Sequence, residues 1–245
     1  FYDLRVDEVR EEQVRLASRY GIYGFCYYYY WFNGRKLLER PLEAMLRSGR
    51  PDFPFCICWA NESWSRRWDG SEHEVLMEQV HSPESDRRFI EDIIPILKDP
   101  RYIRVDGLPL LLVYRFSLMS DPISATETWR RACLDAGVGA VHIAAVQSFG
   151  IEDPRVFGCD SAVEFPPHGI SASEITDKLE GLDPAFEGKV FDYRDLISTD
   201  EFKAKRPYGV FPGVMPCWDN TARRGARGHV FHHATPQSYE IWLRN

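Results

Sequence analysis

Apolar positions along the chain alternate between short continuous runs and longer stretches with apolar residues at helical spacing. The continuous runs predict six strands, near residues 22–29, 53–59, 110–114, 141–147, 162–165 and 210–214. The helical spacing predicts helices over 7–19, 36–48, 82–98 and about 124–136, a weaker one within 192–205, and a final one from 236. Strands that are apolar throughout and alternate with helices are typical of a parallel sheet covered by helices.

Turn and capping signals sharpen these boundaries. Ser82-Pro83 and Thr235-Pro236 each place a capping hydroxyl before a proline suited to the first helical position. Ser124 with Glu127, and Ser171 with Glu174, have the spacing of a capping box. Asp106-Gly107 predicts a turn ahead of the strand at 110–114.

The order of elements predicts an α/β fold, for which a (β/α)8 TIM-type barrel and a doubly wound sheet both fit. No GxGxxG or P-loop follows any predicted strand, which disfavours the nucleotide-binding version. Six strands are two fewer than an eight-stranded barrel needs. We therefore expect one domain over residues 1–245, which is an incomplete barrel if the fold is of the barrel type.

Composition narrows the class of protein. The net charge of −7 argues against a nucleic-acid surface, which is usually basic. No run approaches the ~20 apolar residues that span a bilayer. The six cysteines form no CxxC pair, which favours buried free thiols and a reducing, cytoplasmic location. The seven histidines show no HExxH spacing, and we expect neither a metal nor a cofactor.

Candidate chemistry follows the predicted strands, where parallel α/β folds place functional residues. Aromatic residues stand there beside amides, carboxylates and guanidinium groups. This mixture suits a sugar, because a pyranose ring packs on an aromatic face while its hydroxyls bond to polar groups. The expected substrate-binding residues are Tyr29, Trp31, Trp59, Asn61, Trp64, Arg67, Trp68, Asp69, Gln147, His168, Trp218, Asp219, Asn220 and Arg223.

Glycosidic-bond chemistry usually needs two carboxyl groups with separate roles. Glu62 and Glu164 end predicted apolar strands, where a carboxylate without a role or partner would be costly to bury, and we take them as catalytic candidates. Plainer interpretations stay open. Asn61-Glu62 could be a capping turn, and residues 27–30 could be core, with at most half of them facing a site.

Several segments resemble the WbsX-type family, which is related to glycoside hydrolase family 99. They are residues 21–34 (GIYGFCYYYYWFNG), 53–62 (FPFCICWANE), 68–70, 101–107 (RYIRVDG), 163–168 (VEFPPH) and 216–220 (PCWDN). Tyr29 departs from the family, whose members often carry histidine there. The family's later Asn-Glu-Trp segment, where family 99 carries catalytic carboxylates, has no counterpart in these residues. The resemblance therefore implies a (β/α)8 barrel that lacks its first and last strands in residues 1–245.

The resemblance implies an enzyme of the glycosyltransferase or glycoside hydrolase type, acting on glycosidic bonds of a bacterial surface polysaccharide such as O-antigen. The resemblance does not decide between glycosyl transfer and retaining hydrolysis. A non-catalytic glycan-binding barrel is the alternative from another class. A metabolic enzyme for a phosphorylated substrate is a third reading, and it lacks a glycine-rich phosphate loop. The expected partner is an oligosaccharide or polysaccharide.

Overall fold

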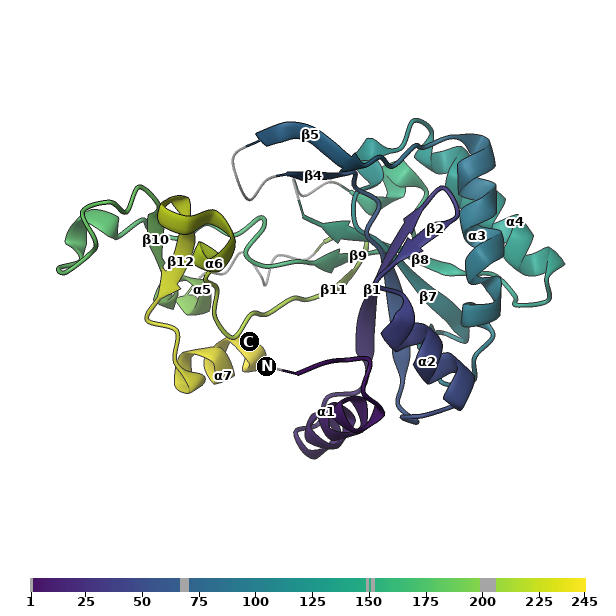
Figure 1. Ribbon diagram of the computed structural model, residues 1–245, viewed down its shortest axis with the longest axis horizontal. Helices are drawn as coiled ribbons and strands as arrows, with labels where there is room; N and C mark the ends of the chain where they lie inside the picture. The colour runs from purple at the N-terminus through teal and green to yellow at the C-terminus, as the bar shows by residue number, and fades with distance from the viewer. Residues whose placement is uncertain (1, 67–70, 149, 151–152, 199–205) are drawn as a thin grey trace. The chain divides into compact units, whose positions relative to one another are not determined.

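The computed structural model describes residues 2–66, 71–148, 150, 153–198 and 206–245 (Figure 1). The chain divides into two compact units. The first comprises residues 1–64, 75–146 and 152–162, and the second comprises 65–74, 147–151 and 163–245. Each unit is described by itself below, and a single domain over residues 1–245 stays a prediction.

A parallel sheet forms the centre of the first unit. Its strands are β1 (Phe25–Phe32), β3 (Phe55–Trp59), β7 (Leu108–Val113) and β8 (His142–Gln147). β1 pairs with β3, β3 with β7 and β7 with β8, and all three pairings are parallel. The short strands β2 (Arg35–Leu37) and β6 (Arg104–Val105) add antiparallel pairings to β1 and β7. Within the described residues of this unit the strand order β8-β7-β3-β1-β2 does not close on itself, as expected for an incomplete barrel.

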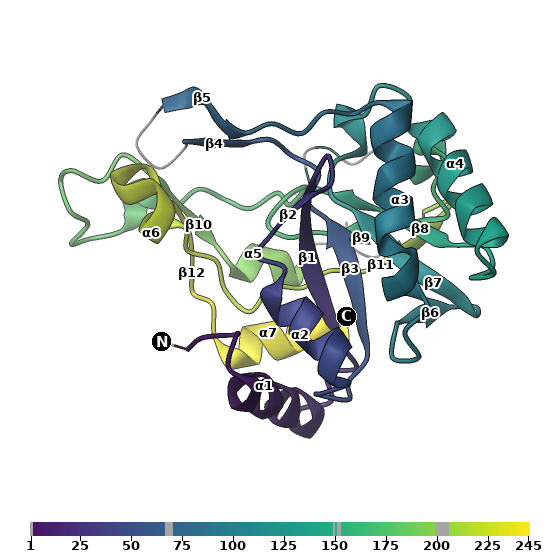
Figure 2. The same cartoon turned by 45° about the vertical axis from the view of Figure 1, so that its right-hand side comes forward.

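Helices α1 (Asp7–Arg19), α2 (Arg40–Ser48), α3 (Pro83–Leu97) and α4 (Pro122–Asp135) follow the strands in the predicted alternation. Helices α3 and α4 lie side by side against the sheet (Figures 1 and 2). The core lies beneath α3, where the ring of Trp59 stacks on that of Phe89 with centroids 3.9 Å apart. Trp129 of α4 packs against both rings and is fully buried. The continuous apolar strands are therefore explained by burial under these helices.

Two predicted helix starts are confirmed and three predictions are wrong. Ser82 caps α3 by accepting from the Ser85 amide, and Thr235 forms a capping box at α7. Asp121, and not Ser124, caps α4, because its carboxylate accepts from the Ser124 amide. Residues 35–37 are strand, so α2 begins at Arg40. Glu174 is not in a helix but in an isolated antiparallel bridge with Phe191.

Residues 101–107 serve the structure at the amino-terminal ends of β3 and β7. Asp106 (φ 48°) and Gly107 (φ 80°) form the two-residue turn of the β6–β7 hairpin, where positive φ favours glycine and asparagine-like residues. The hydroxyl of buried Tyr102 accepts from the Ile57 amide (3.2 Å) and donates to the Leu110 carbonyl (2.9 Å). Tyr102 thus adds a side-chain link between β3 and β7 at the start of their paired segment.

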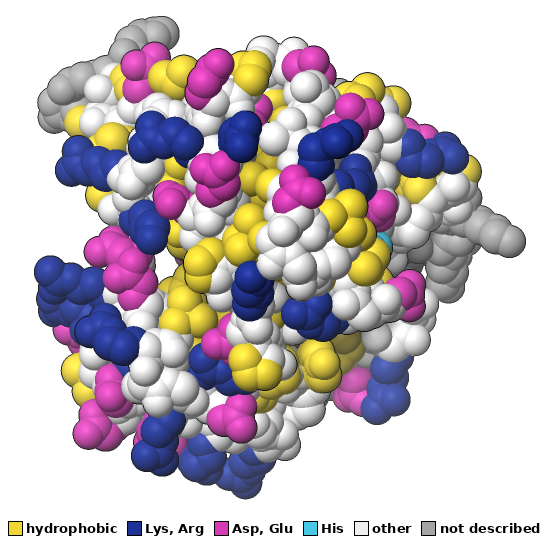
Figure 3. Space-filling view, turned by 90° about the vertical axis from the view of Figure 1, so that its right-hand side faces the viewer, with side chains coloured by type: hydrophobic (Ala, Val, Ile, Leu, Met, Phe, Trp, Pro, Cys, Tyr) yellow, Lys and Arg dark blue, Asp and Glu magenta, His cyan; other side chains and the backbone are white. Residues whose placement is uncertain are grey.

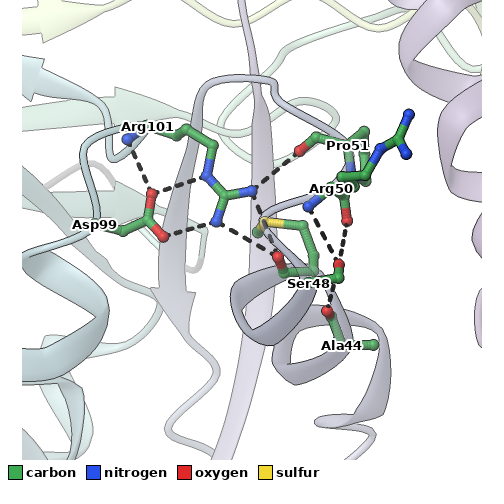
Figure 4. Close-up of polar contacts among 7 residues, drawn as sticks. Ala44, Ser48, Arg50, Pro51, Asp99 and Arg101 are labelled. Carbon is green, nitrogen blue, oxygen red and sulfur yellow. Dashed lines mark hydrogen bonds and ion pairs between the residues drawn. The ribbon is translucent and has the colours of Figure 1, made fainter.

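Arg101 anchors the same region (Figure 4). Its guanidinium forms a salt bridge with Asp99 (2.7 Å) and donates to the Pro51 carbonyl (3.1 Å) and, more weakly, to that of Met45 (3.4 Å). The hydrogen bonds from the Arg101 guanidinium to the Asp99 carboxylate lower the pKa of Asp99. Both side chains are nearly buried. Through its bonds to the Met45 and Pro51 carbonyls, Arg101 links the end of α2 to the segment that leads into β6.

The first turns of α3 bury Asp86 against α4. Its carbonyl accepts from the indole of Trp129 (2.9 Å), while its carboxylate Oδ1 is buried without a hydrogen-bond partner among the described residues. Burial, with a smaller contribution from the nearby Asp121 charge, raises the pKa of Asp86 to about 6. A carboxyl group whose pKa is higher in the folded than in the unfolded state costs stability as the pH rises from about 4 through 6.

We therefore expect Asp86→Asn to stabilise the protein above pH 7. A shift of about two pKa units corresponds to about 2–3 kcal/mol, and the gain should vanish below pH 4, where both states are protonated. Chemical denaturation from pH 4 to pH 8 measures it. The exposed Glu91→Gln on the same helix is the control, with a change of about 0.5 kcal/mol or less at every pH. A gain at pH 8 no larger than the control's would contradict the prediction.

The second unit has its own small core. Strands β10 (Lys189–Asp192) and β12 (His229–His232) pair in parallel. Helices α5 (Arg194–Ser198), α6 (Thr221–Arg224) and α7 (Pro236–Arg244) and strand β11 (Gly209–Phe211) complete it. The buried cluster comprises Tyr193, Leu196, Met215, Phe231 and Trp242. Strand β9 (Ser161–Glu164) contributes residues to both units, and β4 (Trp64–Arg66) pairs with β5 (Ser71–Met77).

Short 3₁₀ turns complete the described backbone: Phe116–Leu118, Pro154–Phe157, Thr176–Lys178 and Gly225–Arg227. On the face drawn in Figure 3, acidic and basic side chains are intermingled among apolar ones. In the described part of the chain, no helix has the length and apolar character needed to cross a membrane.

Candidate functional site

The carboxyl ends of β3 and β7 are joined by a reciprocal pair of hydrogen bonds from Asn61. This side chain is fully buried. Its Oδ1 accepts from the Arg115 amide (2.8 Å), and its Nδ2 donates to the Arg115 carbonyl (2.9 Å). Asn61 therefore fixes the backbone from which the next residue, Glu62, projects.

Glu62 forms a salt bridge with Arg115, whose Nη1 donates to Oε1 at 2.7 Å. The two side chains keep 25% and 20% of their surface exposed, so the pair is partly desolvated yet within reach of a ligand. Arg115 was not among the residues predicted from the sequence, although it follows a strand end as closely as Glu62 does. The same strand-end rule, applied to residues 114–115, would have found it.

His81 supports the loop that carries Glu62. Its Nε2 lies 3.3 Å from the carbonyl oxygen of Asn61, so this nitrogen carries the proton and donates. The ring stands edge-on to Trp59, with centroids 5.6 Å apart. Burial lowers the pKa of His81, which favours the neutral ring. The Gln79 amide also donates to the hydroxyl of Ser63 (3.0 Å), so residues 79–81 hold the loop from one side.

Four aromatic rings flank the ends of these strands, and we call them the aromatic face: Tyr28, Tyr30, Trp64 and Tyr114. Tyr28 is stacked against Tyr30 at 6.2 Å and stands edge-on to Tyr114 at 5.9 Å. Trp64 stands edge-on to Tyr30 at 5.2 Å. Tyr28 is 40% exposed and the other three are partly exposed. Trp64 lies two residues from Glu62 and Tyr114 adjoins Arg115, so aromatic and charged groups leave the same strand ends.

Three predicted substrate-binding residues lie on the opposite side of the sheet. Tyr29 is 4% exposed, and Trp31 and Trp59 are fully buried under α3. The indole of Trp31 donates to Asp92 (2.6 Å) and that of Trp59 to the Trp31 carbonyl (3.2 Å). Alternation along β1 places residues 28 and 30 on one face and 29 and 31 on the other. The prediction selected the half that packs in the core, and we leave these three out of the proposed site.

The second unit holds the remaining described candidates. Glu164 accepts from the Gly213 amide (3.1 Å), and Gln147 donates to the hydroxyl of Tyr208 (3.2 Å). His168 stacks on Phe165 with ring centroids 5.9 Å apart. Position 213 has room only for glycine, because a Cβ there would lie 2.5 Å from the Glu164 carbonyl oxygen. A pocket shared by Glu62 and Glu164 stays a prediction.

Residues 218–223 form a braced loop in the second unit. Asp219 accepts from the Thr221 amide (2.8 Å), and hydrogen bonding to the Thr221 side chain and then to this amide lowers the pKa of Asp219. Asn220 accepts from the His229 amide (2.7 Å). Trp218 is half-buried against the core of this unit, and Arg223 is exposed. Asp219 and Asn220 thus have local structural partners, and their contact with sugar stays a prediction.

The remaining three candidates, Arg67, Trp68 and Asp69, lie outside the described residues. Among the residues that are described, no group of three His, Cys, Asp or Glu side chains could hold a metal ion. The candidate site in the first unit therefore comprises Glu62, Arg115 and the aromatic face, with Asn61 and His81 hydrogen-bonded to its loop.

Comparison with known proteins relates the whole chain to carbohydrate-active proteins. A family model described as "Glycosyltransferase WbsX" matches residues 1–245. Two proteins named WxcX, from strains B100 and ATCC 33913 of Xanthomonas campestris pv. campestris, are each 45% identical over 243 residues. The match covers 99% of this chain and 35% of each relative, so the chain spans about a third of their length.

Solved structures show the same fold at low sequence identity. A glycoside hydrolase-like protein superimposes with a TM-score of 0.59 at 13% identity, over 98% of this chain and 72% of the other. A GH99 endo-alpha-mannosidase from Bacteroides thetaiotaomicron gives a TM-score of 0.57 at 14% identity, over 99% and 64%. The α/β fold with a parallel sheet is therefore that of the GH99-like structures.

Proposed function

Because the chain belongs to the WbsX glycosyltransferase family, we propose that it is a carbohydrate-active enzyme that acts on glycosidic bonds of a bacterial surface polysaccharide. The reaction is glycosyl transfer or retaining hydrolysis. The 245 residues act as one barrel-type catalytic domain in the cytoplasm. Glu62 and Glu164 are the proposed carboxyl groups of the reaction, as glycosidic chemistry requires two.

One observation carries the proposal. A partly buried carboxylate, Glu62, follows the carboxyl end of a parallel strand, pairs with Arg115, and stands two residues before Trp64 of the aromatic face. Carboxylate and guanidinium make charge-assisted hydrogen bonds to hydroxyl groups, which are about twice as strong as neutral ones. The aromatic rings offer a flat apolar surface to the less polar side of a sugar ring.

The roles of the other residues follow from their contacts. Arg115 orients the Glu62 carboxylate, and Asn61 acts through Arg115 by fixing its backbone. His81, whose neutral ring is favoured by burial, braces the loop and does not touch the substrate. Trp64, Gln147, His168, Trp218, Asp219, Asn220 and Arg223 remain proposed sugar contacts.

Removal of an aromatic ring tests sugar binding. We expect Trp64→Ala to weaken binding of surface polysaccharide from the source organism roughly tenfold or more, as loss of a well-packed tryptophan contact does. Isothermal titration on preparations of known folded fraction measures the affinity. The matched control is Tyr20→Ala, which removes a ring that is 71% exposed at the end of α1 and should leave affinity unchanged.

The outcome also separates the two classes of function. Product formation from the polysaccharide, followed by mass spectrometry, supports an enzyme. Binding that depends on Trp64 without any product from the full protein would favour the glycan-binding module. Equal affinities for both alanine variants and the wild type would remove the aromatic face from the site.

A further inference from the structure

Three thiols meet on one face of the sheet, on the neighbouring strands β1 and β3. Cys26 is the register partner of Cys56 in this parallel pair, and Cys58 shares the face of Cys56 because it lies two residues further along the strand. Register and alternation therefore bring the three thiols together on this face, and each influences the ionisation of the others. This cluster has no part in the proposed glycan chemistry.

The three thiols differ in access to solvent. Cys26 is exposed, whereas Cys56 and Cys58 keep 4% and 2% of their surface. The expectation that all the cysteines are buried is therefore wrong for Cys26 and, in the second unit, for Cys217. A reagent in solution therefore reaches Cys26 more readily than it reaches Cys56 or Cys58.

The surroundings also favour the thiolate of Cys26. Hydrogen bonds donated by Cys56 and Cys58 stabilise a negative charge on its sulfur, which lowers the pKa of Cys26 and raises the pKa values of its two neighbours. The thiolate is the nucleophilic form of cysteine, so exposure and hydrogen bonding select the same residue. Cys217 is exposed without such thiol neighbours and offers a comparison within the same chain.

We propose that Cys26 is a reactive thiol site for hydroperoxides and soft electrophiles, with Cys56 as the thiol that resolves its oxidised form. Strands in a sheet lie roughly 4.8 Å apart, which falls within the Cα separation that a disulfide spans. Cys56 is the register partner and is placed to form this bond, whereas Cys58 stands opposite Tyr28 and serves as a hydrogen-bond donor.

The chemistry balances with a peroxide as oxidant. The Cys26 thiolate attacks hydrogen peroxide, the O–O bond breaks, and sulfenic acid and hydroxide form. The Cys56 thiol then attacks the sulfenic sulfur, an S–S bond forms and the S–O bond breaks. Water leaves with the thiol proton, two electrons have passed from the two sulfurs to the peroxide, and an external thiol reverses the step by exchange.

Competition between two exposed cysteines tests the reactive site. The full protein that carries these residues is treated with limiting iodoacetamide at pH 7, and alkylation of each cysteine peptide is followed by mass spectrometry. We expect Cys26 to react at least tenfold faster than Cys217. Equal or slower reaction of Cys26 would overturn the proposal, including the case in which another part of the protein covers it.

Peroxide treatment tests the resolving thiol. The wild type should give a Cys26–Cys56 disulfide that dithiothreitol reverses. Cys56→Ser should instead accumulate a dimedone-trapped sulfenic acid on Cys26, while Cys58→Ser should still form the disulfide. Melting temperatures confirm that each variant is folded. A wild type that forms no Cys26–Cys56 bond, or a Cys56→Ser protein without the dimedone adduct, would refute the role of Cys56.

Discussion

Glu62→Gln should lower glycan turnover by about 10²–10⁴-fold and leave the fold intact. The substitution keeps the shape of the side chain and removes its charge. If Glu62 transfers a proton, the loss of that step is typically worth this factor. The Arg115 partner stays beside an amide oxygen, and Asn61 still fixes the loop backbone, so unfolding free energy should fall by about 1 kcal/mol or less.

Asp99→Asn is the matched control, because it also removes one carboxylate from an arginine pair. This pair lies at the amino-terminal ends of the strands and is more deeply buried than that of Glu62. We expect it to cost about 2 kcal/mol or more in stability, since the Arg101 charge loses its partner, while activity per folded molecule stays at the wild-type level. Turnover and melting temperature are measured on the same preparations.

Glu62→Gln should therefore lower turnover and leave stability nearly unchanged, whereas Asp99→Asn should lower stability and leave turnover per folded molecule unchanged. If Glu62→Gln lowers the melting temperature and leaves specific activity unchanged, Glu62 is a structural partner of Arg115 and not a catalytic group. If both variants lose activity only in proportion to their unfolded fraction, the catalytic assignment of Glu62 fails while sugar binding at the aromatic face remains testable through Trp64.

Tyr102→Phe should destabilise the protein by about 2–4 kcal/mol. The lost hydroxyl leaves the Ile57 amide and the Leu110 carbonyl buried without partners, and each such group costs about 1–3 kcal/mol. Both residues are buried, so water cannot replace the hydroxyl without opening the strands. Urea denaturation gives the free energy, and hydrogen exchange at the Ile57 amide reports the local loss.

Tyr27→Phe provides the control for Tyr102. Both tyrosine rings stand edge-on to Phe55, at 6.0 Å for Tyr27 and 5.3 Å for Tyr102. Tyr27 is less buried, and its substitution should change stability by about 0.5 kcal/mol or less. Equal effects of the two substitutions would mean that ring packing, rather than the two hydrogen bonds, holds Tyr102 in place.

Sequence reasoning located the strands that are apolar throughout, because full burial leaves a continuous hydrophobic run. It missed β2 and β12, whose residues Arg35, Lys36 and His229 carry polar side chains on short, partly exposed strands. It also read Ser124 and Glu127 as a capping box, although Asp121 stands one turn earlier before a proline. Two capping signals one turn apart occur there, and the structure uses that of Asp121.

The site was harder to predict than the fold. The strand-end rule found Glu62 and Asn61, yet alternation along β1 fits either choice of inward face. The choice is made by α3, whose Phe89 covers Trp31 and Trp59. Such a contact between residues thirty to sixty positions apart leaves no trace in local spacing, and Trp31 and Trp59 look the same as Tyr28 and Tyr30 in a one-dimensional pattern.

Two side chains, Tyr102 and Asn61, link β3 to β7 by hydrogen bonds, and this affects how the two strands can move. Tyr102 joins the strands near their amino-terminal halves, and Asn61 joins them past their carboxyl ends. A shearing force along the strands would act on the hydrogen bonds of Tyr102 and Asn61 together. Separation of the strands from one end would break them one after the other. When the sheet fluctuates, the backbones at Glu62 and Arg115 should therefore move together. Rotation of their side chains is then the main motion that changes the distance between the two charged groups.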